Sequence, residues 1–216
     1  MRLDLRTASY EEFETFVFDH YPEDEVDDKW YWKTDVELEI EPRRAIDYLT
    51  RVLSGGSTLL EKYTPRQVAE GLNYLIGGTA SELLDQFWNP EVPWPDRQRC
   101  IQTIPKIYTD VLERDPDGVG GCAYMLWDWV AYGYQCGNYD PKTDAEAARV
   151  QDAMFAALKP MLESKHPETQ VGALHGLGHL CHRDSARAIR EFLASGLPVD
   201  SKVREYAGRV LEGYFQ

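Results

Sequence analysis

Three histidines lie close together in the segment ETQVGALHGLGHLCHRD, near the C-terminal end of the chain. On a helix that advances 100° per residue, His175, His179 and His182 fall within about 60° of one another. Imidazoles at positions i and i+4, such as His175 and His179, can both reach one metal ion. His182 lies about 10 Å from His175 along the axis and cannot easily share that ion. No glutamate accompanies the pair as in HExxH, so a third ligand has to come from elsewhere in the chain.

The apolar residues of this segment occupy roughly the opposite side of the helix. They are Ala173, Leu174, Leu177, Leu180 and Cys181. The histidine stripe therefore faces either solvent or a neighbouring pair of helices. It can serve for packing or capping near the helix end, where a cation is favoured, for contact with a partner, or for metal binding. We favour packing or capping and predict no metal and no cofactor.

A second candidate is the aromatic segment GCAYMLWDWVAYGY. One side of the expected helix is apolar, and the other carries aromatic rings with a single carboxylate, Asp128. A helix of this kind is usually packed all round. If one side is open, Trp127, Asp128 and Tyr134 offer the composition that binding hot spots favour. Adjacent residues on a helix point in different directions, so the triplet 127–129 does not form one pocket by itself.

The third candidate is the acidic and aromatic segment EDEVDDKWYWKTDVELEIE, residues 23–41. Its acids and rings can meet Lys and Arg through charge pairs and cation–π contacts. We expect the acids to steer a basic partner and the rings of Trp30 and Trp32 to anchor it. The steering acids are Asp24, Glu25, Asp27 and Asp28. The alternative is that Trp30 and Trp32 fold back on the first helix while the acids stay solvated.

The distribution of charge is uneven along the chain. The net charge is −14, and residues 1–41 hold 14 acidic against 4 basic residues, whereas the rest hold 23 against 19. Binding of nucleic acid or of an anionic membrane requires the opposite sign and is disfavoured. The acidic end is either a solvated surface or a means of steering a basic protein.

The location of the protein follows from what its sequence lacks. No stretch approaches the roughly 20 apolar residues that span a bilayer, and the start does not have the pattern of a secretory signal. We expect a cytoplasmic protein. The cysteines, which show no CxxC pair, are expected to be reduced core thiols. They are Cys100, Cys122, Cys136 and Cys181.

The elements that position these candidates are expected to be helices joined by short Gly/Pro turns. Ser9 with Glu12 forms a capping box, and Thr64 precedes a proline at the first helical position. About ten helices are predicted, at roughly 10–20, 42–54, 65–77, 80–88, 96–114, 121–134, 144–163, 168–181, 185–194 and 201–215. Residues 36–40 alternate like a strand, but an isolated strand has no sheet to join, so we expect an extended segment or a ragged helix start.

The C-terminal half looks repetitive, because ETQVGALHGLGHL is followed by SARAIREFLAS after a tight turn. Short connections imply antiparallel neighbours, and the small residues let backbones approach closely. This pattern resembles the HEAT-like α-solenoid family, convincingly over 144–216 and plausibly back to 42. The resemblance implies an all-α, right-handed solenoid of antiparallel helix pairs over 42–216. Residues 1–41 would form an acidic helix and extended segment packed on it, within a single domain.

The segments ALHGLGHL, WYW and MLWDW are also similar to an uncharacterised group of bacterial HEAT-like proteins, loosely associated with toxin–antitoxin-type gene pairs. That resemblance implies partner binding and supplies no catalytic residue. Other HEAT-like proteins are DNA glycosylases, whose sites combine tryptophans with an aspartate, or lyases that act on tetrapyrroles. Residues 127–129 contain the tryptophans and the aspartate of a glycosylase site, but the negative net charge of the chain disfavours binding of DNA.

Our hypothesis is a non-enzymatic protein-binding module, with an immunity protein that blocks a basic toxin as its specific form. The concave surface would complete the contact through Trp127, Asp128, Tyr134, His175 and His179. The alternatives are a generic scaffold and a HEAT-like enzyme or metal-binding protein. The sequence predicts no catalytic residue and leaves the oligomeric state open.

Overall fold

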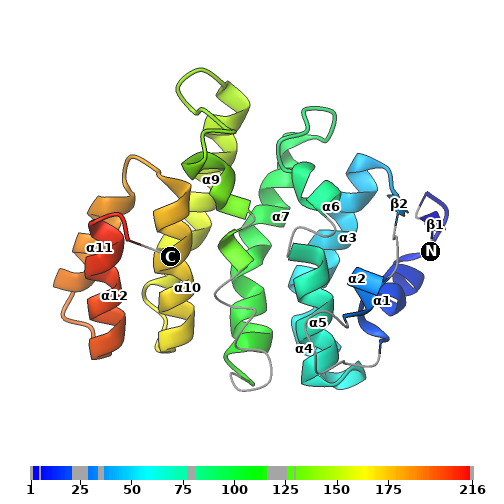
Figure 1. Cartoon of the computed structure of the whole chain (residues 1–216), viewed down its shortest axis with the longest axis horizontal. Coiled ribbons are helices and arrows are strands. Elements are labelled where there is room, and N and C mark those ends of the chain that lie inside the picture. Colours follow the sequence, from blue (N-terminus) through cyan, green and yellow to red (C-terminus); the bar gives the residue numbers. More distant parts are fainter. Residues whose placement is uncertain are drawn as a thin grey trace. The chain divides into compact units, whose positions relative to one another are not determined.

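The computed structural model describes residues 2–4, 6–20, 29–33, 37–76, 81–115, 126–128 and 130–214. These residues are helical apart from two short strands and the connections, so the expected all-α class is confirmed (Figure 1). The chain divides into two compact units, Met1–Cys122 and Ala123–Gln216. None of the described helices is both long and apolar enough to cross a membrane.

The first unit contains helices that pack mainly as pairs. In chain order its elements are β1 (Arg2–Asp4), α1 (Tyr10–Phe18), α2 (Trp30–Lys33), β2 (Glu37–Glu39), α3 (Pro42–Ser54), α4 (Gly56–Lys62), α5 (Pro65–Ile76), α6 (Ser81–Asp85), α7 (Trp94–Ile107) and η2 (Tyr108–Leu112). Helix α3 packs on α7, and α1 packs on α5. The π-helical turn η2 continues α7 just beyond Pro105, a residue that cannot donate a backbone hydrogen bond.

The two strands correct one expectation. Strand β2 pairs in parallel with β1, with Leu3 opposite Leu38, so the alternating segment is not isolated (Figure 1). The prediction failed because the partner strand lies at the very start of the chain, where only three residues take part. Arg6 supports the pair from the side, since its guanidinium contacts Asp4 at 2.7 Å and Glu39 at 2.8 Å.

Several helix ends follow the local signals in the sequence. The Ser9 hydroxyl accepts a hydrogen bond from the Glu12 backbone at 3.2 Å, and the Glu12 carboxylate accepts one from the Ser9 backbone at 2.7 Å, which confirms the capping box. Helix α5 begins at Pro65, directly after Thr64, as predicted. Helix α3 ends at Ser54 with Gly55 as its C-cap. These ends depend on near neighbours in the chain, which is why the sequence predicts them.

The second unit is built around α10. Its described elements are helical residues 126–128 and 130–135, α9 (Ala145–Met161), α10 (Pro167–Leu180), α11 (Ser185–Ala194) and α12 (Ser201–Leu211). Helix α10 packs against α9, α11 and α12. Neighbouring helices therefore cover the histidine side of α10 as well as its apolar side, and His175, His179 and His182 are all buried. The solvent-facing orientation of the histidine stripe is therefore wrong, and its side chains face other helices of the second unit.

A glycine permits the closest approach to α10. A Cβ atom added at Gly176 would lie 2.7 Å from Leu158 Cδ2 and 2.8 Å from Trp127 Cγ. Trp127 and Leu158 are fully buried. Only a residue without a side chain fits between them, so Gly176 fixes how near the Trp127 helix comes to α10.

The cysteines are only in part what the sequence predicts. The three described ones are free thiols, and Cys100 is buried in α7. Burial raises the pKa of the Cys100 thiol to about 12. The expectation of core thiols is wrong for Cys136 and Cys181, which are exposed. Both lie where a helix ends. Cys181 is the C-cap of α10 and has a left-handed backbone, so the helical spacing that placed it among the apolar residues ends there. Cys122 lies outside the described residues.

Candidate functional site

Asp128, His175 and His179 converge inside the second unit. The two histidines lie one turn apart on α10, so their rings project to the same side. The His175 Nε2 contacts the Asp128 Oδ1, and the His179 Nε2 lies 2.9 Å from the same oxygen. The two Nε2 atoms are 3.1 Å apart. These three ligand-type atoms all lie within 4.8 Å of one another, as a mononuclear metal site requires.

The other ring nitrogens of both histidines are also engaged. The Nδ1 of His175 is hydrogen-bonded to the Tyr206 hydroxyl of α12 at 2.7 Å. The Nδ1 of His179 is hydrogen-bonded to Gln135 Oε1. The two imidazole planes meet at 75°, with ring centroids 4.5 Å apart. Both rings are thus held from behind, and their Nε2 atoms are directed at one carboxylate.

The cluster is a group of polar side chains of which the two histidines are almost fully buried. The side chains of His175 and His179 are 2% and 6% exposed, whereas that of Asp128 is 22% exposed. Burial alone would raise the pKa of Asp128, but the hydrogen bonds with His175 and His179 outweigh it and lower that pKa to about 2. The carboxyl group is therefore ionised at neutral pH. The half-exposed Tyr132 lies edge-on to the His179 ring, with centroids 5.5 Å apart.

His182 does not belong to this cluster, in keeping with its predicted distance along the helix. Its Nε2 donates to the Asp152 carboxylate at 3.0 Å, and its Nδ1 accepts from the backbone N–H of Asp184 at 3.1 Å. Its ring stacks on Phe155, with centroids 4.2 Å apart. His182 closes the turn between α10 and α11, the packing role that we favoured for the stripe as a whole.

The other candidates of the aromatic helix are interior residues. Trp127 is fully buried against Gly176, and the Tyr134 hydroxyl donates to the Ala147 carbonyl at 2.8 Å. Asp128, on the next position, points instead to the histidines, so the two neighbours diverge as helical geometry predicts. Contact of Trp127, Asp128, Tyr134, His175 and His179 with a partner stays a prediction.

The two tryptophans of the N-terminal aromatic segment differ: Trp30 folds back on the first unit, and Trp32 is exposed. Trp30 stacks on His20 with centroids 3.8 Å apart and packs on Tyr74, so it folds back on the first unit. Trp32 is 59% exposed. Lys29 ties the segment to α5 through an ion pair of 2.6 Å with the buried Glu70. The acids predicted to steer a partner lie outside the described residues: Asp24, Glu25, Asp27 and Asp28.

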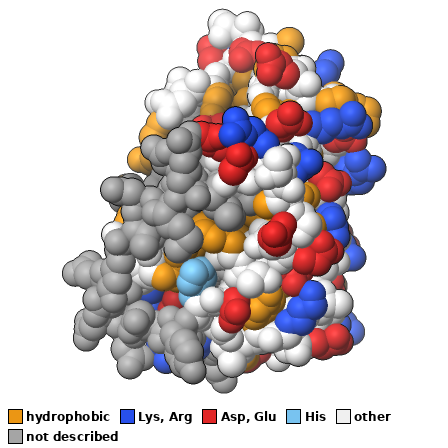
Figure 2. Space-filling model, turned by 90° about the vertical axis from the view of Figure 1, so that its right-hand side faces the viewer, with side chains coloured by type: hydrophobic (Ala, Val, Ile, Leu, Met, Phe, Trp, Pro, Cys, Tyr) orange, Lys and Arg blue, Asp and Glu red, His pale blue; other side chains and the backbone are white. Residues whose placement is uncertain are grey.

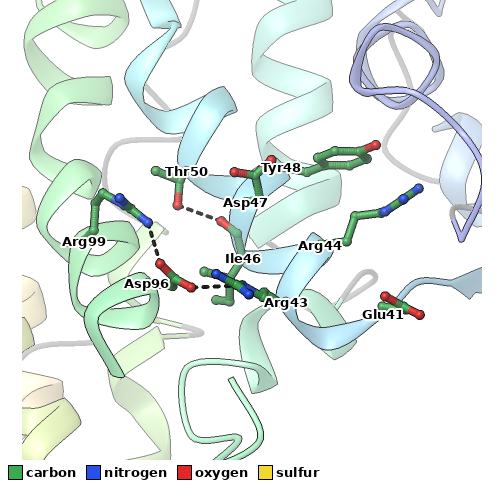
Figure 3. A pocket seen from close by; sticks show the side chains of 9 residues that line it. All are labelled: Glu41, Arg43, Arg44, Ile46, Asp47, Tyr48, Thr50, Asp96 and Arg99. Atoms are coloured by element: carbon green, nitrogen blue, oxygen red, sulfur yellow. Dashed lines mark hydrogen bonds and ion pairs between the residues drawn. The ribbon is translucent and has the colours of Figure 1, made fainter. Parts of the chain in front are cut away.

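The first unit also has a polar pocket of about 420 Å³ between α3 and α7, which the sequence does not reveal. Figure 3 shows Arg43 and Arg99 pointing at Asp96, with contacts of 3.1 and 2.5 Å. Three arginines and three acidic residues line the pocket, so its formal charges balance. On the described part of the face in Figure 2, acidic and basic side chains are likewise interspersed.

Comparison with protein-family models, curated proteins and solved structures finds no match to this chain. The HEAT-like resemblance therefore stays a prediction. The main feature that sequence reasoning missed is the pairing of Asp128 with the histidines. A signal was present, because Asp128 is the single carboxylate in the sequence of the predicted helix 121–134, and a metal bound by the two histidines requires a third ligand from elsewhere. The distance of 47 residues in sequence concealed the pairing.

Proposed function

We propose that this chain is a non-enzymatic protein-binding module that takes a basic protein as its partner. In this proposal the helices form a short right-handed solenoid of antiparallel pairs. The packing of α10 against α9, α11 and α12 through short connections supports that arrangement for the second unit. Solenoids of this kind present extended surfaces that commonly bind another macromolecule.

The exposure of Trp32 is the observation that carries the proposal. Large aromatic side chains are enriched at the centres of protein interfaces. Trp32 keeps 59% of its surface exposed, whereas Trp30 and Tyr31 beside it pack inward. It also stands in the segment with the largest surplus of acidic residues. An exposed indole in a segment whose sequence is acidic suits Lys and Arg side chains through cation–π contacts and charge pairs.

Affinity capture from the source cells, followed by elution along a salt gradient, tests this proposal. We expect one basic protein that is retained at low salt and released as salt rises, because screening weakens charge pairs. Trp32→Ala should lower the captured amount at least about tenfold, as loss of a hot-spot residue does. Tyr214→Ala is the matched control, since Tyr214 is a 69% exposed aromatic residue in the other unit. Equal capture by both variants would refute the role of Trp32.

The steering role of the acids has its own test. Reversal of the charges at Asp24, Glu25, Asp27 and Asp28 should slow association and flatten its dependence on salt. Unchanged affinity and salt dependence would remove steering from the proposal. An enzymatic toxin activity in the captured protein, blocked by this chain, would establish the immunity form. A captured partner without such activity would favour the scaffold.

A further inference from the structure

We propose that Asp128, His175 and His179 bind one divalent transition-metal ion. The proposal concerns the second unit and does not depend on the protein-binding function. It rests on the convergence of three ligand-type atoms, on the hydrogen bond behind each histidine and on the partial exposure of Asp128 to solvent.

The hydrogen bond behind His179 leaves a place for a proton or a metal ion between two acceptor atoms. His179 donates its Nδ1 hydrogen to Gln135 Oε1, so a neutral His179 presents a lone pair at Nε2. That lone pair lies 2.9 Å from the carboxylate oxygen Oδ1 of Asp128. Two acceptors at this distance repel unless a proton or a metal ion lies between them. A metal ion satisfies this pair and the adjacent His175 Nε2 at the same time, because it accepts a lone pair from each.

The separations of the three atoms fit an ion after a small adjustment. A tetrahedral site with bonds of about 2.0–2.2 Å holds its ligand atoms roughly 3.3–3.5 Å apart. The two Nε2 atoms are 3.1 Å apart, and His179 Nε2 and Asp128 Oδ1 are 2.9 Å apart. Spreading the imidazoles takes a few tenths of an ångström. Asp128 supplies the larger movement, which its partly exposed side chain allows.

Each histidine has the second contact that metal-binding histidines normally have. A ligating imidazole usually donates its other ring N–H to an oxygen, which fixes the tautomer and the ring orientation. Gln135 Oε1 accepts the Nδ1 hydrogen of His179, and the Tyr206 hydroxyl is hydrogen-bonded to Nδ1 of His175. His182 provides an internal contrast, because its Nδ1 accepts a backbone N–H and its Nε2 faces a single carboxylate. Among these three histidines, only His175 and His179 have their Nε2 atoms side by side at one carboxylate.

The donor set indicates the class of metal. Two imidazole nitrogens and one carboxylate oxygen suit Zn²⁺, Co²⁺ and related first-row ions, whereas Ca²⁺ and Mg²⁺ take oxygen ligands. Three protein ligands leave a fourth position for water or another small ligand. The carboxylate of Asp128 is the least buried of the three ligands, which places the entry path of the ion on its side.

Metal titration of the untagged, full-length protein after chelator treatment tests the site. Calorimetry with Zn²⁺, together with elemental analysis, should give one ion per chain. Asp128→Asn and His179→Gln should abolish stoichiometric binding. His182→Gln, which replaces a buried histidine on the same segment outside the cluster, should retain it. Cys136→Ser/Cys181→Ser should also retain it, which separates the site from adventitious binding by exposed thiols.

A milder pair of variants covers the case in which ligand variants do not fold. Tyr206→Phe removes only the hydroxyl behind His175 and should weaken Zn²⁺ binding about 10- to 100-fold, as loss of such support does. Tyr134→Phe removes a buried hydroxyl that donates to the backbone elsewhere and should leave affinity unchanged. Co²⁺ added to the wild-type protein should give the intense visible absorption of a four-coordinate site.

Three results would overturn the proposal. The first is that the wild-type protein takes up no stoichiometric Zn²⁺ or Co²⁺. The second is that binding survives His179→Gln but is lost in the cysteine double variant. The third is ¹⁵N resonances that show His179 protonated on both nitrogens with Zn²⁺ present in excess, since a proton would then occupy the place of the metal.

Discussion

Replacing Gly176 by alanine probes the contact that brings the Asp128 helix against α10. The new methyl group would lie 2.7 Å from Leu158 Cδ2, 2.8 Å from Trp127 Cγ and 3.0 Å from Trp127 Cβ. The leucine methyl can rotate away at small cost. The tryptophan atoms cannot, because Cβ is bonded directly to the backbone and the indole is fully buried. The two helices must therefore move apart by several tenths of an ångström.

Two effects of opposite sign set the magnitude. Overpacking a buried site costs about 1–3 kcal/mol, and this site belongs in the upper half of that range because the opposing atoms are fixed. Alanine in a helix interior is favoured over glycine by about 1 kcal/mol. The net result is a loss of about 1–2 kcal/mol in the free energy of unfolding, since the steric cost exceeds the helix propensity. A chain of this length then melts roughly 2–8 °C lower.

Urea unfolding followed by circular dichroism measures this difference. Gly208→Ala is the matched control, because Gly208 also lies inside a helix, α12, but nothing approaches its added Cβ within 4 Å. That variant should gain about 0.4–1 kcal/mol from propensity and reduced freedom of the unfolded chain. The two substitutions should thus shift stability in opposite directions. A Gly176→Ala protein as stable as wild type would refute the close approach between α10 and Trp127.

Five further outcomes are expected. Arg97→Met should cost about 2–4 kcal/mol, measured by urea unfolding, because the buried guanidinium donates to two backbone carbonyls at 2.9 and 3.0 Å. Trp30→Ala should lower stability by roughly 2 kcal/mol, whereas Trp32→Ala should stay within about 0.5 kcal/mol in the same assay. A thiol reagent at pH 8 should label Cys136 and spare Cys100. Burial raises the pKa of the Cys100 thiol to about 12. The difference in free energy of unfolding between wild type and Cys100→Ser should therefore be largest below pH about 8.5, where the thiol is protonated in both the folded and the unfolded state, and should fall as pH rises toward 12. Zn²⁺ at 100 times its dissociation constant should raise the free energy of unfolding by about 2.7 kcal/mol, and excess chelator should reverse this.

Most of the helices could be predicted because their signals are local, whereas the short helices α2 and α4 were not predicted. Ser9 and Glu12 cap α1, Thr64 precedes α5, and Asp144 caps α9 through hydrogen bonds to residues two and three positions ahead. Each signal lies within four residues of the backbone groups that it satisfies. The strand pairing of 2–4 with 37–39 could not be predicted in this way. It joins segments separated by 35 residues in register, and neither segment is long enough to identify the other.

The same distinction separates the predicted and the missed parts of the histidine cluster. The spacing of His175 and His179 predicts that they share a face, and the greater distance of His182 predicts that it stands apart; the structure agrees on both points. Which neighbour that face meets depends on how the helices pack. Asp128 reaches the histidines because Gly176, on the adjacent position of α10, lets the Trp127 helix come close. A glycine adds no side chain to the hydrophobic pattern, so the sequence does not indicate which residue packs against Gly176.

The burial of the cluster also limits what it can contribute to binding a protein. A partner that docks on the surface meets Asp128 at its edge and Tyr132, because the histidine rings are almost fully covered. The imidazoles are then better suited to holding an ion than to direct contact. If both proposals hold, the metal supports the second unit from inside while Trp32 acts from the first unit. Variants of Trp32 should therefore change capture of the partner without changing metal content, and variants of His179 should change metal content first. Loss of both properties in a single Trp32→Ala protein would contradict this separation.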